Sequence, residues 1–226
     1  MAELLQKIIP NVMEKLPELW ECCGETLVML LVSGVISFFI GLLLGVVLTV
    51  TQRGGILQST VVFTIIDKTI NILRSIPFII LLFALIPLTR LIVGTAIGTR
   101  GAILPLIFGT VPFFTRQIES ALSELSPGLI RAAQSMGLGP VDIILRVYLR
   151  ECIPGIVRAT TITFVSLVGL TAMAGAVGGG GLGDFAIRYG YQRNQIDVTY
   201  VSVIILLLLV SLLQGLGNAI IRKTTH

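Results

Sequence analysis

The chain has 226 residues, of which 54% are hydrophobic and only 12% are charged, and its mean hydropathy is +0.97. A soluble domain carries about 25% charged residues, so this composition excludes an ordinary soluble protein and indicates a membrane protein. The formal net charge of +4 matches the basic loops that membrane proteins place on one side of the bilayer. It therefore gives no reason to expect a nucleic-acid partner.

The apolar segments predict an all-α membrane protein with five transmembrane helices. A helix needs about 20 mostly apolar residues to cross a bilayer core. Three uncharged stretches reach this length, whereas the uncharged stretches 75–89 and 101–115 reach it only by extension, the first backwards and the second past Arg116. The expected spans within one membrane domain over 25–222 are residues 26–52, 57–89, 99–121, 154–180 and 198–221.

The ends of the chain differ in charge, which predicts an orientation in the cell (inner) membrane. The first 25 residues carry five glutamates against Lys7 and Lys15, whereas the C-terminal sequence IRKTTH is basic. Lys and Arg favour the cytoplasmic side. We therefore expect residues 1–24 to form an extracytoplasmic segment, and the C-terminus and the loop 122–153 to be cytoplasmic. The first residues lack the pattern of a signal peptide.

The second expected span carries polar residues on one helical face. Thr64, Asp67, Asn71 and Arg74 are separated by three, four and three residues, which places them together on a helix. Charged groups at membrane depth are costly and face the bundle interior or water. This polar face predicts either part of a transport path or a contact with another span near the cytoplasmic interface. Pro77 predicts a bend in the same span.

The cytoplasmic loop predicts two short helices joined by a turn. Ser126 can cap the first helix, with Pro127 in its first position, and Gly137 suits the left-handed residue that ends such a helix. Gly139 and Pro140 turn the chain into the second helix, which stops at 154–155. The pair could rest on lipid headgroups or dock on a cytoplasmic protein. A DNA-binding helix-turn-helix fits poorly, because both ends are tethered to spans.

Nucleotide binding and catalysis by this chain are not expected. The sequence GGGGLG at 178–183 satisfies G-x-G-x-x-G but follows no strand, so it indicates a turn and close packing and not a dinucleotide site. No G-x-x-x-x-G-K-[ST] motif is present, so ATP would have to be hydrolysed by a partner. Cys22, Cys23 and Cys152 have no histidine nearby, which favours buried apolar side chains over a zinc or disulfide site.

Residues 131–137, RAAQSMG, and the VYL that follows nine residues later resemble the EAA loop of binding-protein-dependent ABC importer permeases. The family pattern is Glu-Ala-Ala, three residues, Gly, nine residues, Ile, any residue and Leu-Pro. Arg131 and Arg150 replace the Glu and the Pro, and Val147 replaces the Ile. The resemblance implies the type I ABC importer transmembrane domain, with a coupling helix that contacts an ATPase through Arg131, Ala132, Ala133, Ser135, Met136 and Gly137.

Two further segments, 71–98 and 169–191, are similar to the family of methionine importer permeases. That resemblance extends from about residue 25 to residue 222. It implies a homodimer, two cytoplasmic ATPase subunits that bind ATP and Mg, and an extracytoplasmic substrate-binding protein. It also implies that Met173, in TAMAGAV, is a pore gate at the two-fold axis, although a Met among small residues also fits a flexible core side chain.

The leading interpretation is the permease subunit of an ATP-driven methionine importer that works by alternating access. A permease for another amino acid or an osmolyte would carry the same loop motif. A secondary transporter that needs no ATPase is a third possibility, but such proteins often show inverted repeats, and no repeat is visible here. A membrane scaffold without transport activity is disfavoured by the polar face, and an enzyme by the lack of paired carboxylates or a histidine base.

Overall fold

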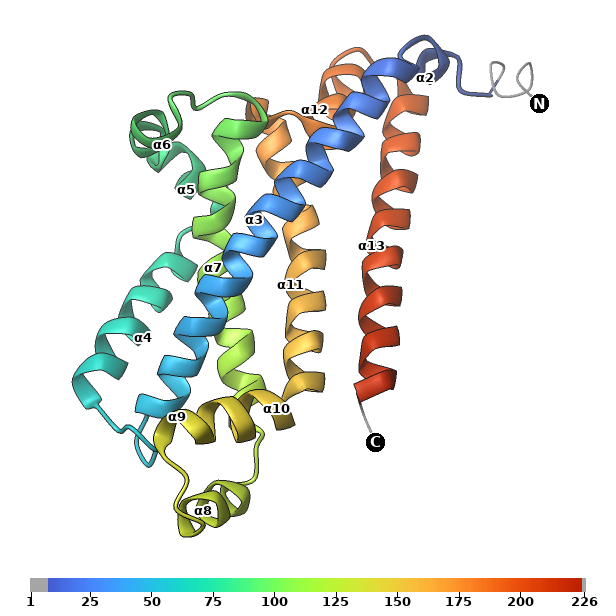
Figure 1. Ribbon diagram of the computed structural model, residues 1–226. Coiled ribbons are helices and arrows are strands. Elements are labelled where there is room, and N and C mark those ends of the chain that lie inside the picture. Colours follow the sequence, from blue (N-terminus) through green and yellow to red (C-terminus); the bar gives the residue numbers. More distant parts are fainter. Residues whose placement is uncertain (1–7, 225–226) are drawn as a thin grey trace. The chain divides into compact units, whose positions relative to one another are not determined.

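The computed structural model describes residues 8–224, and these residues form helices joined by short turns and loops (Figure 1). The all-α expectation is confirmed. The elements in chain order are α2 (Pro10–Glu14), α3 (Leu16–Thr51), α4 (Thr60–Ser75), α5 (Phe78–Ala84), α6 (Ile86–Val93), α7 (Gly98–Ser123), α8 (Pro127–Ser135), α9 (Pro140–Asp142), the π-helical η1 (Ile143–Tyr148), α10 (Leu149–Glu151), α11 (Ile153–Ala174), the π-helical η2 (Gly175–Gly179), α12 (Gly181–Phe185), the π-helical η3 (Ala186–Tyr191) and α13 (Ile196–Thr224).

The described residues contain four helical segments that are long and apolar enough to cross a bilayer, and a fifth is not confirmed. The four are Leu16–Thr51, Gly98–Ser123, Ile153–Gly179 and Ile196–Thr224. The remaining expected span, 57–89, is divided among α4, α5 and α6. The predicted bend at Pro77 is a complete break. Because a proline disfavours helical geometry in the residue before it, Ile76 adopts an extended conformation (φ −85°, ψ 122°).

The N-terminal part of the chain joins the first long helix without interruption. α3 begins at Leu16 and has no break at the expected boundary between residues 24 and 25. Before it, Asn11 of α2 donates two hydrogen bonds of 2.9 Å, from its backbone and its side-chain amide, to the carboxylate of Asp197. These bonds fix α2 to the start of α13. Residues 1–7 of the expected extracytoplasmic segment lie outside the described residues.

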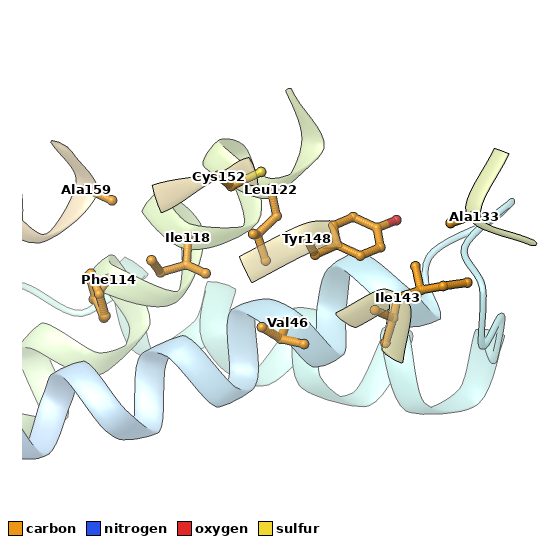
Figure 2. Close-up of a cluster of buried hydrophobic side chains, with 10 residues drawn as sticks. Val46, Phe114, Ile118, Leu122, Ala133, Ile143, Tyr148, Cys152 and Ala159 are labelled. Carbon is orange, nitrogen blue, oxygen red and sulfur yellow. The ribbon is translucent and has the colours of Figure 1, made fainter. Parts of the chain in front are cut away.

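The chain divides into two compact units, each with its own core. Unit 1 comprises residues 1–35, 77–108 and 164–213, and unit 2 comprises residues 36–76, 109–163 and 214–226. Buried side chains in unit 1 include Met29, Leu106 and Leu167 in one cluster and Leu182, Phe185 and Val198 in another. Figure 2 shows the core of unit 2, to which α3, α7, α8, η1 and α11 contribute Val46, Phe114, Ile118, Leu122, Ala133, Ile143, Tyr148 and Ala159.

Close approach of α3 and α7 within unit 2 depends on two glycines. A Cβ atom at Gly41 would lie 2.6 Å from Cδ1 of Phe114, and one at Gly45 would lie 2.5 Å from Cγ2 of Ile118. Both distances are shorter than any ordinary contact. Small residues let membrane helices approach closely enough to gain packing energy where water supplies no hydrophobic driving force. The two glycines therefore hold α7 in the position from which α8 follows.

Candidate functional site

The first helix of the loop, α8, has the caps that the sequence predicts. The hydroxyl of Ser126 accepts a hydrogen bond of 3.3 Å from the backbone N–H of Gly128, and Pro127 occupies the first helical position. At the other end Gly137 has φ +80°. The N–H of Leu138 donates to the carbonyl of Ala133 and the N–H of Gly137 to that of Gln134, which is the Schellman arrangement.

One side of α8 is anchored and the other is open. Ala133 is 2% exposed and packs in the core of unit 2 (Figure 2). The remaining predicted coupling residues are exposed: Arg131, Ala132, Ser135, Met136 and Gly137. Met136 retains 73% of its surface. Arg131 makes no ion pair or hydrogen bond with any described residue. The open side of α8 therefore combines a cation, a large apolar side chain and two small residues.

The second helix, α9 to α10, forms the support for α8 (Figure 1). Ile143 and Tyr148 are buried in the same core as Ala133, and burial raises the pKa of the Tyr148 phenol. The outer surface of this helix carries an ion pair of 3.2 Å between Arg146 and Asp142. The α8 to α10 segment is thus a helical hairpin with an apolar inner face and a charged outer face.

The predicted polar face of α4 meets a cation from α7. Arg116 forms ion pairs with Asp67 and, at 2.6 Å, with Glu119. It also donates to the side-chain oxygen of Asn71 at 2.9 Å, and the Asn71 amide donates to Asp67 at 3.2 Å. One guanidinium therefore joins α7 to α4 within unit 2 through three hydrogen bonds, two to Asp67 and one to Asn71, and donates a fourth to Glu119 on its own helix.

The other members of the predicted face take no part in this network. Arg74 is exposed and makes no hydrogen bond or ion pair within the part of the chain that the structure describes, and Thr64 is half-buried. Arg116 and Glu119 were not predicted as site residues. A visible signal was their spacing of three residues inside an otherwise apolar segment, because such a pair shares one helical face. The structure therefore places Asp67 and Asn71 in a polar network and leaves Arg74 outside it.

Met173 lies near the end of α11 and is 41% exposed. The residues that follow it turn sharply, with φ +88° at Gly178, +77° at Gly180 and +76° at Gly181, which confirms the predicted glycine turn. The carboxylate of Glu25 accepts a hydrogen bond of 2.6 Å from the N–H of Gly181. The start of α3 thereby fixes the segment that follows Met173.

A second ionic cluster, which the sequence did not predict, lies in unit 1. Arg188 pairs with Glu18 at 3.0 Å and with Asp184 at 2.7 Å. The phenol of Tyr189 donates to Glu18 at 2.8 Å, and this hydrogen bond, with burial adding to it, raises the pKa of Tyr189. The cluster joins the start of α3 to α12 and η3. Its chemistry is structural, because every charge in it has a partner of opposite sign.

The described residues hold no group of three or more His, Cys, Asp or Glu side chains that could bind a metal ion. Cys22 and Cys152 are buried, Cys23 is half-buried, and all three thiols are free. Neither the glycine turn nor the polar network places a nucleophile beside a base. The features that remain are a membrane-spanning helical scaffold, the exposed helix α8 and a methionine among small residues.

These features define a multi-pass transmembrane protein with an exposed helix between two of its spans, and comparison with known proteins gives its family. The family described as the binding-protein-dependent transport system inner membrane component matches residues 37–226. This chain belongs to that family and is a multi-pass inner membrane protein.

Several relatives match most of the chain, including one from Vibrio cholerae and one from Bacillus subtilis. This chain is 48% identical over 202 residues to the probable D-methionine transport system permease protein MetI of Vibrio cholerae. The match covers 89% of this chain and 90% of the relative. The chain is 42% identical over 217 residues to the methionine import system permease protein MetP of Bacillus subtilis, covering 96% of this chain and 97% of the relative.

Solved structures share the architecture. A chain of the MetNI methionine ABC transporter, solved in inward-facing conformations, matches with a TM-score of 0.89 and 45% identity, covering 93% of this chain and 98% of that one. An amino acid ABC transporter with histidines matches with a TM-score of 0.78 at 16% identity and supports the fold alone. The fold is that of a type I ABC importer transmembrane domain.

Proposed function

We propose that this chain is the permease subunit of an ATP-driven importer that moves methionine across the cell membrane. The observation that carries the proposal is the match to a chain of the MetNI methionine ABC transporter, at 45% identity and a TM-score of 0.89 over 93% of this chain. Relatives from two bacteria, Vibrio cholerae and Bacillus subtilis, carry methionine in their names. An identity of this size over the whole membrane domain supports a shared substrate as well as a shared fold.

The working assembly comprises two copies of this chain, two cytoplasmic ATPase subunits and an extracytoplasmic substrate-binding protein. ATP and Mg are bound by the ATPase, since this chain has no phosphate-binding motif. The chain is therefore a transport subunit and not an enzyme. Membrane lipid covers the apolar surface of α13, where Leu207, Leu208 and Leu212 are exposed.

The exposed side of α8 is the contact with the ATPase. Arg131, Ala132, Ser135 and Met136 would face the partner, and Gly137 would end the helix beneath them. Ala133 lies on the opposite side of α8 and packs in the core of unit 2. Through this packing, a displacement of α8 would move α7 and α11. The network around Arg116 would then make α4 move together with α7.

We propose five crossings with the N-terminus outside and the C-terminus in the cytoplasm, and with a membrane domain over residues 25–222. α4 and α5 would together provide the crossing that no single helix supplies. Arg131, Arg146 and Arg150 lie in the loop 122–153, and basic loops favour the cytoplasm. The exposed Trp20 and Tyr191 suit the outer interface, where amphipathic rings lie at headgroup level.

Met173 would close the pore, with one copy from each subunit at the two-fold axis. Its partial exposure in the single chain leaves its side chain free to meet a second copy. Alternating access then requires two conformations that bind the ATPase differently, and release of the Met173 contact in one of them would open the path.

The test is methionine-stimulated ATP hydrolysis by the reconstituted complex with its binding protein. Gly137→Asp should abolish stimulation, because it adds a side chain and backbone strain at the end of α8. Gly54→Asp is the matched control, since Gly54 also has φ +80° and open space around it. Failure of the chain to associate with any ATPase would contradict the proposal and favour an ATPase-independent transporter. Stimulation by another amino acid, but not by methionine, would replace the substrate.

A further inference from the structure

A small polar pocket lies between α7 and α11 at the ends nearest α8, entirely within unit 2. Its volume is about 60 Å³, and its lining includes the small residues Ala121, Gly155 and Ala159. A Cβ atom at Gly155 would lie 3.1 Å from Cβ of Ala121, so the two helices approach closely beside the pocket because Gly155 has no side chain. The pocket is lined by Gln117, Ser120, Ala121 and Glu124 of α7 and the turn after it, and by Gly155, Arg158, Ala159 and Ile162 of α11.

The pocket presents one negative and one positive charge. Glu124 and Arg158 both line it and both are exposed. Neither makes an ion pair or hydrogen bond with any residue in the range 8–224. This differs from the clusters around Arg116 and Arg188, in which each charge has a partner. Two exposed opposite charges without a protein partner on one small pocket suit a ligand that carries both charges close together.

We propose that this pocket binds the zwitterionic head of a free α-amino acid. The Arg158 guanidinium would bind the carboxylate of the ligand, because its planar set of donors matches the two carboxylate oxygens. The side-chain carboxylate of Glu124 would accept hydrogen bonds from the ammonium group of the ligand. Gln117 and Ser120 supply further polar groups on the same face of α7. The volume has room for several water molecules, enough for the charged head, and the side chain of the ligand would leave through the open side along Ile162.

The position of the pocket connects it with transport, so the inference rests on the proposed function. Along the single helix α11, Arg158 and Ile162 are four residues apart and Met173 follows eleven residues later. At 100° per residue these three positions fall on one face of the helix. Ser166 and Gly169, which are exposed, lie on the same face. The pocket therefore lies on the same helix that carries the proposed gate, and an amino-acid substrate is the ligand that the proposed function supplies to it.

The experiment measures binding of radiolabelled L-methionine to the whole permease–ATPase complex in lipid nanodiscs, without nucleotide and without binding protein. Glu124→Gln and Arg158→Gln should each weaken binding at least tenfold. The matched controls Glu151→Gln and Arg53→Gln neutralise exposed charges outside the pocket and should bind as the wild type does. Methionine methyl ester, which lacks the carboxylate, and N-acetylmethionine, which lacks the ammonium, separate the two roles.

The wild type should prefer methionine to both analogues. Arg158→Gln should no longer prefer methionine to the methyl ester but should still prefer it to N-acetylmethionine. Glu124→Gln should no longer prefer methionine to N-acetylmethionine but should still prefer it to the methyl ester. Absence of saturable binding in the wild type, or equal binding by all four variants, would overturn the site. Methionine uptake by the same complex with its binding protein is measured in parallel. Normal uptake without binding at the pocket would leave the proposed function standing, whereas loss of uptake with pocket binding intact would contradict the function alone.

Discussion

Replacing Arg116 by alanine should leave two carboxylates without a counter-charge inside the membrane domain. Arg116 is the cation that contacts both Asp67 and Glu119, whose side chains are 28% and 17% exposed. Hydrogen bonds to charged groups contribute about 1.5–3 kcal/mol each. Removing one partner of a buried ion pair costs about 3–5 kcal/mol. Because the guanidinium keeps 19% of its surface, water offsets part of this, and we expect a loss of about 3 kcal/mol.

The measurement is thermal unfolding of the purified chain in detergent. For a domain of this size a loss of 1 kcal/mol lowers Tm by about 2–4 °C, so Arg116→Ala should lower it by about 6–12 °C. Arg100→Ala is the control on the same helix, because Arg100 is exposed and makes no ion pair with a described residue. A triple change of Arg116, Asp67 and Glu119 to leucine should recover most of the loss. Equal Tm values for the two alanine variants, or no recovery in the triple variant, would refute the electrostatic explanation.

Three further changes test packing, capping and the gate. Gly45→Ala should lower the free energy of unfolding by about 1–3 kcal/mol because of the contact with Ile118. Gly215→Ala should leave it unchanged, because nothing lies within 4 Å of a Cβ at that position. Denaturant titrations of the two variants measure the difference. Gly137→Ala should destabilise α8 by about 1–2 kcal/mol, because alanine is strained in the left-handed conformation. The measurement is the amount of ATPase that co-purifies with the variant, and an amount equal to that of the wild type would contradict a coupling role. Met173→Ala should let methionine leak from loaded proteoliposomes without ATP, and wild-type retention would argue that Met173 only fills space.

Local features were predictable from the sequence because the interacting residues are neighbours in the chain. Ser126, Pro127 and Gly137 cap α8 through contacts that span at most a few residues. The glycine turn after Met173 follows from the same kind of local conformational preference. These signals were sufficient to find the exposed helix and its limits.

Contacts between helices were not predictable. Asp67 and Arg116 are 49 residues apart, and helical periodicity gives the face of each helix without giving its neighbour. The sequence therefore suggested Arg74 as a member of the polar network, while the structure supplies Arg116. The effect of Pro77 on the number of membrane spans was not predictable for a related reason. A proline indicates a bend, but the direction that the chain takes afterwards depends on packing elsewhere.

On α8, the residues that maintain the fold are different from the residues on the exposed outer side. This difference affects how such transporters diversify. Its fold rests on Ser126, Gly137 and the buried Ala133, whereas Arg131 and Met136 on its outer side contribute nothing to the core. Side chains on the outer side can therefore change without loss of stability. On the proposed contact of α8 with the ATPase, a replacement such as Arg131 for the Glu of the family pattern would be matched by a single charge change in the ATPase. Pairs of subunits would then diverge and cease to exchange with those of related importers.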